Sequence, residues 1–193
     1  MTKTEFAARL QQACASVTAA EQELTEIDSK FGDADHGLTM TKIAGAISGA
    51  VAESDGGIQS MLDDAAMAVM VLNGGSAVPL WNTWLDGMQE NAPDGDEIDT
   101  AGLQAIFARA LEALNEMSGA QVGDKTMMDA LIPASEAIAA YTGNDEQGVF
   151  AAAAAAATRG AEASKQFVSK CGRAKSYGTQ TIGTPDAGAT SMA

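Results

Sequence analysis

Apolar residues recur three and four positions apart along most of this chain, and that spacing limits the folds it can adopt. A repeat of this kind places the apolar side chains on one face of an α-helix, whereas a half-buried strand needs strict alternation. No convincing alternating stretch is present, and aromatic residues make up only 5% of the sequence. The pattern predicts an all-α protein with helices over residues 4–23, 38–53, 58–72, 79–90, 100–117, 126–141 and 145–169. Thr100 and Asp145 are expected to act as N-caps, and Pro79 fits a first helical turn.

The linkers between these segments are of two kinds. Residues 54–57 and 91–96 look like ordinary solvated turns. Four other linkers are rich in Gly, Asp, Ser and Thr, namely residues 28–37, 73–77, 119–126 and 172–191. Alternate connections of an antiparallel helix bundle lie at the same end of the bundle. We therefore expect these four linkers to meet at one functional end.

Size and charge exclude several classes of protein. With 193 residues, the chain is expected to form a single domain over residues 1–193. Its net charge of −15 argues against nucleic acid or an anionic membrane surface as a partner. The two cysteines lack metal-type spacing, and the sequence shows neither a secretory signal nor a span of roughly 18 apolar residues. A cytoplasmic location is the expectation.

The segment IDSKFGDADHG, residues 27–37, holds three carboxylates within eight positions. Converging carboxylates repel one another unless protons or cations compensate them. Mg²⁺ prefers oxygen ligands and combines carboxylates with water and substrate phosphates. Asp28, Asp33 and Asp35 are therefore candidate metal ligands, and the alternative is an acidic surface turn. His36 is the only histidine, and beside a metal loop it is a candidate partner for phosphate.

Three further motifs each have an ordinary alternative. NGGSAV, residues 73–78, offers backbone N–H groups to phosphate, or else is a tight turn with Ser76 as a cap. In GDKTMMDAL, residues 123–131, Asp124 and Thr126 are potential caps of the next helix. The segment from residue 172 to 191 is glycine-rich and carries Arg173, whose planar fork suits phosphate, although a disordered tail is the alternative. The P-loop string GxxxxGK[ST] and the G-x-S-x-G motif are both absent.

Taken in order, these segments resemble the nucleotide-binding subunit of dihydroxyacetone kinases, the DhaL-like family. GDADHG with Asp28, the turn at residues 74–78, GDKTMMDAL and residues 172–191 each match a family motif. The resemblance covers essentially the whole chain. It implies eight antiparallel helices closed into a barrel-like cone with the nucleotide site in the loops at one end.

The resemblance also implies a set of site residues. Asp28, Asp33 and Asp35 would form the catalytic centre and hold two Mg²⁺ ions that bridge the phosphates of ADP or ATP. The implied nucleotide contacts are His36, Gly37, Thr39, Ser76, Ala77, Ser118 or Gly119, Met127, Arg173, Asp186 and Gly188. The sequence departs from the family pattern at Thr39, Ala77, Val78 and Gln180, whereas the aspartates are unaffected.

The implied activity is transfer of a phosphoryl group to dihydroxyacetone or a related short ketose held on a separate, DhaK-like subunit. Either ATP exchanges freely, or ADP stays bound and a phosphotransferase-system protein rephosphorylates it. A homodimer is a further assembly left open. The alternative function is a non-catalytic, nucleotide-binding regulatory partner of the same fold. A Ca²⁺-buffering protein is disfavoured because no EF-hand spacing is present.

Overall fold

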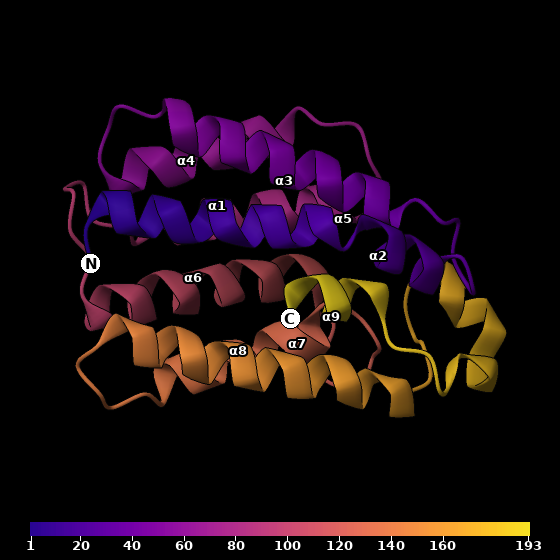
Figure 1. Cartoon of the computed structure of the whole chain (residues 1–193). Helices are drawn as coiled ribbons and strands as arrows, with labels where there is room; N and C mark the ends of the chain where they lie inside the picture. The colour runs from indigo at the N-terminus through magenta and orange to yellow at the C-terminus, as the bar shows by residue number, and fades with distance from the viewer.

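The chain folds into a bundle of helices without a β-strand (Figure 1). The structure is a computed structural model that describes all residues from 1 to 193. Its α-helices are α1 (Lys3–Ala19), α2 (Glu21–Asp28), α3 (His36–Glu53), α4 (Ile58–Met70), α5 (Ala77–Glu90), α6 (Thr100–Ser118), α7 (Met128–Ala139), α8 (Glu146–Ala163) and α9 (Ala187–Met192). Two 3₁₀ helices, η1 (Ser164–Gln166) and η2 (Arg173–Thr181), lie between α8 and α9. The all-α prediction is confirmed, and α1 to α8 form the expected eight-helix bundle.

Helix boundaries follow local capping chemistry, with two corrections to the sequence prediction. Asp145 caps α8 by accepting a hydrogen bond from the Gly148 N–H at 2.7 Å, as expected. Thr100 is not a cap, because Asp99 precedes it and accepts from the Gly102 N–H at 2.8 Å. The first predicted helix is two helices that meet at Ala20. The second of them, α2, carries the chain on to Asp28 and so delivers the first aspartate to the loop end.

The core holds the long helices together along their length. One cluster of 23 buried residues runs through the bundle and includes Met61, Leu62, Leu85 and Met88, all fully buried. Burial of apolar side chains of this size contributes about 1.5–3 kcal/mol each. The molecule thus has a rigid frame that fixes where its loops lie. None of its helices combines the length and apolarity that a membrane span requires.

The two ends of the bundle differ, as the linkers predicted. In Figure 1 the N-terminus and the ordinary turns lie at the left end, and the loops after α2, α4 and α6 lie at the right with η2. The C-terminal segment is ordered, and α9 packs against α2, α7 and α8. The tail interpretation of residues 172–191 is therefore wrong.

Candidate metal and nucleotide site

The three predicted aspartates meet where α2 ends and α3 begins. One carboxylate oxygen from each of Asp28, Asp33 and Asp35 lies within 4.8 Å of the others. Asp28 Oδ2 accepts hydrogen bonds from the N–H groups of Asp35 at 3.1 Å and His36 at 3.4 Å. Gly32 is required here, because a Cβ at that position would come within 1.9 Å of Asp28 Oδ1. The loop between α2 and α3 thus folds back so that its last residues hydrogen-bond to the Asp28 carboxylate.

This carboxylate cluster is short of positive charge. Burial, then the charges of Asp33 and Asp28, raise the pKa of Asp35. One cationic side chain forms an ion pair with the cluster: the guanidinium of Arg173, a residue of η2, lies 2.6 Å from the Asp33 carboxylate. Three clustered carboxylates with one exposed arginine suit a hard divalent cation such as Mg²⁺. The residues present fit the predicted metal site.

His36 joins this loop to the C-terminal helix. Its Nε2 atom lies 3.1 Å from the hydroxyl oxygen of Ser191 in α9. Burial lowers the pKa of His36, against the opposite effect of Asp28 and Asp35. The next residue, Gly37, leaves no room for a side chain, since a Cβ would lie 2.1 Å from the Glu21 carbonyl oxygen. The start of α3 is thereby held tightly against α2 and near α9.

The glycine-rich turn before α5 lies beside the same helix. A Cβ on Gly74 would come within 2.6 Å of Val78 and 3.1 Å of Thr39, so the turn packs closely on α3. Thr39 is only 6% exposed, which limits what it can offer to a ligand. Ser76 and Ala77 begin α5, and the Ser76 side chain makes no capping hydrogen bond. The Ser76 hydroxyl and the Ala77 N–H are thus available to an anion, whereas the Val78 N–H bonds to the Gly75 carbonyl oxygen at 3.3 Å and Pro79 has no N–H.

A buried lysine connects the loop after α6 to the C-terminal segment. Lys125, 5% exposed and with a φ of 62°, donates from Nζ to three carbonyl oxygens: Ser164 at 2.7 Å, Phe167 at 3.2 Å and Thr184 at 2.6 Å. Asp129 is fully buried and accepts from the N–H groups of Gly123 and Thr126, both at 2.6 Å. The resulting fold brings Gly188 against the backbone of Met127.

Sequence reasoning located most of this arrangement but misassigned some roles. Asp124 does not cap α7; it pairs with Lys170 at 2.7 Å. Thr126 accepts from the Met128 N–H at 3.2 Å. Gly119 ends α6 with a φ of 61°, and its N–H bonds within that helix to Asn115.

Two further residues of this end were missed. Lys125 and Ser191 received no role from the sequence, and no local pattern reveals their partners, which lie far along the chain.

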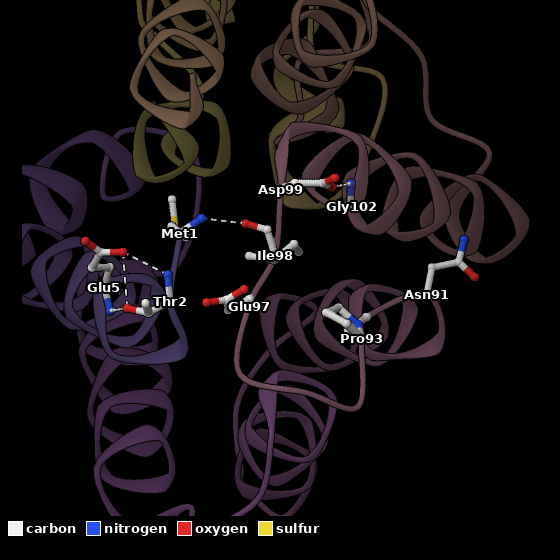
Figure 2. A pocket seen from close by; sticks show the side chains of 10 residues that line it. Met1, Thr2, Glu5, Asn91, Pro93, Glu97, Ile98, Asp99 and Gly102 are labelled. Carbon is white, nitrogen blue, oxygen red and sulfur yellow. Dashed lines mark hydrogen bonds between the residues drawn. The ribbon is translucent and has the colours of Figure 1, made fainter. Parts of the chain in front are cut away.

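The opposite end holds a hollow of about 630 Å³ with different chemistry (Figure 2). Its lining includes the carboxylates of Glu5, Glu97 and Asp99 and no basic side chain. Figure 2 shows that two of these carboxylates already accept hydrogen bonds from neighbouring backbone N–H groups, Glu5 from Thr2 and Asp99 from Gly102. The carboxylates that could share a metal ion lie at the loop end, where such an ion would offset the charge of phosphates, so the loop end is the candidate nucleotide site.

Comparison with known proteins gives one family and one fold. The DAK2 domain family matches residues 30–193. D-erythrulose kinase of Mycolicibacterium smegmatis is 38% identical over 179 residues, covering 90% of this chain and 31% of its own length. The ADP-binding subunit DhaL of the PEP-dependent dihydroxyacetone kinase of Escherichia coli is 28% identical over 186 residues, covering 93% of this chain and 87% of that subunit.

A solved structure agrees in fold. The dihydroxyacetone kinase of C. freundii, in complex with AMP-PNP and Mg²⁺, superposes with a TM-score of 0.71 at 23% identity over 96% of this chain and 31% of that one. This chain spans about a third of the length of that kinase and of the erythrulose kinases it matches.

Proposed function

The chain belongs to the DAK2 domain family, and from that premise we propose that it is the nucleotide- and Mg²⁺-binding part of a ketose kinase. The observation that carries the proposal is the carboxylate cluster of Asp28, Asp33 and Asp35, with Arg173 beside it and glycine-rich turns around it. Related proteins named as ADP-binding and as kinases support it. The reaction would move the terminal phosphoryl group of a nucleotide to a hydroxyl group of dihydroxyacetone, erythrulose or a similar short ketose.

Each part of the loop end has a role in this proposal. The three aspartates would hold two Mg²⁺ ions, which when bound neutralise the charge of the nucleotide phosphates. Arg173 offers a bidentate fork to a phosphate once it leaves Asp33. The remaining nucleotide contacts would come from the starts of α3 and α5, the end of α6 and the C-terminal segment: His36, Gly37, Thr39, Ser76, Ala77, Gly119, Met127, Asp186 and Gly188. Such chemistry depends on positioning and charge neutralisation, so this chain needs no nucleophile of its own.

We further propose that the ketose binds to a second, DhaK-like subunit or domain. The one histidine of this chain lies in the metal loop against Ser191, so none is left to hold a ketose covalently. The exposed large hydrophobic residues all belong to the loop end or the adjoining helix ends: Leu38, Met67, Met70, Val71, Met117, Val122, Tyr177 and Ile182. We call this set the apolar rim. Apolar surface gathered around a polar site is typical of a protein interface.

The test is calorimetric titration of the purified chain with ADP, with and without Mg²⁺. Asp35 makes no ion pair and its side chain does not cap α3, so Asp35→Asn removes one charge with little effect on folding. We expect Mg²⁺-dependent ADP binding to weaken at least tenfold in this variant. The control, Asp55→Asn, changes an exposed carboxylate in the turn after α3, at the far end, and should bind as the wild type does. Equal affinities in Asp35→Asn and the wild type would contradict the proposal.

A further inference from the structure

The contact between His36 and Ser191 joins residues that are 155 positions apart in the chain. His36 is the first residue of α3 and follows Asp35 directly, whereas Ser191 lies near the end of α9. The distance from His36 Nε2 to Ser191 Oγ is 3.1 Å, within hydrogen-bond range. Neither the carboxylate cluster nor the predicted nucleotide contacts explain this link.

The direction of this hydrogen bond follows from counting protons. A serine hydroxyl has one proton to donate, and that of Ser191 goes to the Gly188 carbonyl oxygen at 2.9 Å. With its proton on that carbonyl group, the hydroxyl oxygen accepts from the imidazole, and this arrangement places the ring proton on Nε2. In the neutral ring the other nitrogen, Nδ1, is then unprotonated.

We propose that Ser191 is a positioning residue for the metal loop, acting through the imidazole of His36. The ring held by Ser191 fixes the first turn of α3. At that turn, the N–H groups of Asp35 and His36 donate hydrogen bonds to the Asp28 carboxylate, at 3.1 and 3.4 Å. The C-terminal helix therefore sets the arrangement of the aspartates. This inference rests on the proposed function in one respect, that the aspartates bind a divalent cation.

The single histidine makes the link directly measurable. Nitrogen-15 NMR of the ring at one fixed pH reports which nitrogen carries the proton, and Mn²⁺ titration without nucleotide reports metal affinity. We expect the wild type to show the proton on Nε2. Ser191→Ala should give a mixture of tautomers and bind Mn²⁺ about three- to tenfold more weakly, the usual effect of losing one hydrogen bond. Ser191→Thr keeps the hydroxyl and should restore both signals.

A neighbouring residue provides the matched control. Thr190 also donates its hydroxyl proton to a backbone carbonyl within this segment, that of Asp186 at 2.7 Å, but makes no hydrogen bond to His36. Thr190→Ala should leave both the tautomer and the Mn²⁺ affinity unchanged, and circular dichroism should show equal helix content in all variants. A wild-type ring protonated on Nδ1, or unchanged Mn²⁺ affinity in Ser191→Ala, would overturn the proposal. A protein that shows the expected tautomer and Mn²⁺ effects but binds no nucleotide would contradict only the proposed function.

Discussion

At the scale of single residues, three charged side chains lie together between α7, α8 and the C-terminal segment. Lys125 and Asp129 are buried and well provided with hydrogen-bond partners. Asp186 caps α9 by accepting from the Ala189 N–H at 2.8 Å. Burial raises the pKa of Asp186 to about 7, although the Ala189 hydrogen bond and Lys125 act in the opposite direction. This carboxyl group is therefore held in a site that favours its protonated form.

That shift predicts a pH-dependent stability. Because the pKa of Asp186 is higher in the folded than in the unfolded chain, folding binds a proton, and this group costs stability as pH rises from about 4 to about 7. Asp186→Asn keeps an oxygen for the cap and cannot ionise. We expect urea unfolding to show similar stability for the two proteins at pH 4 and a variant more stable by about 4 kcal/mol at pH 8. A stability difference that does not vary with pH would show that Asp186 titrates normally.

At the scale of elements, α7 and α8 approach closely because α8 has a glycine, Gly160, where it faces α7. A Cβ at Gly160 would come within 2.0 Å of the Asp129 carbonyl oxygen, a backbone atom that cannot move aside cheaply. Asp129 in turn holds the loop before α7 through its carboxylate. The contact between these two helices therefore supports the loop end of the bundle.

Two glycine substitutions separate this packing effect from helix propensity. Gly160→Ala should lower the free energy of unfolding by about 1–3 kcal/mol, the usual range for an overpacked site. Gly45 lies inside α3, and a Cβ added there would meet no neighbouring atom within 4 Å. Gly45→Ala should stabilise the protein by about 0.5–1 kcal/mol, since alanine favours a helix interior. Thermal unfolding of both variants tests this, and equal shifts of the same sign would be inconsistent with a close helix contact.

At the scale of the whole molecule, the carboxylate cluster and the exposed large hydrophobic residues lie at one end of the bundle, and the hollow lined by Glu5, Glu97 and Asp99 lies at the other. The apolar rim surrounds the loops that hold the aspartates, and Val71, at the end of α4, is 74% exposed. Exposed apolar residues next to a polar site favour docking of a partner over that site. A ketose-binding subunit seated there would complete the kinase.

A charge placed in the rim tests this division of labour. Val71→Asp should weaken the binding of a ketose-binding subunit at least tenfold and leave the affinity for Mg²⁺ and ADP unchanged, because the valine lies outside the carboxylate cluster. Asp55→Lys, at the far end, is the control and should change neither. Sugar phosphate formation should require both proteins. Turnover by this chain alone would place the ketose site on this chain. Normal subunit binding by Val71→Asp would place the docking surface outside the apolar rim.

The sequence by itself determined the helices, the distinction between the two kinds of linker and the three aspartates of the carboxylate cluster. These features depend on residues close together in the chain, where helical period, capping and spacing act directly. The tertiary structure alone decided the break at Ala20, the three carbonyl partners of Lys125 and the contact between Ser191 and His36. Each of the two side-chain contacts joins residues dozens of positions apart. Such partners meet only after the packed helices have fixed the direction of every loop, because a hydrogen bond requires its atoms within about 3 Å and residue spacing in the chain does not encode that distance.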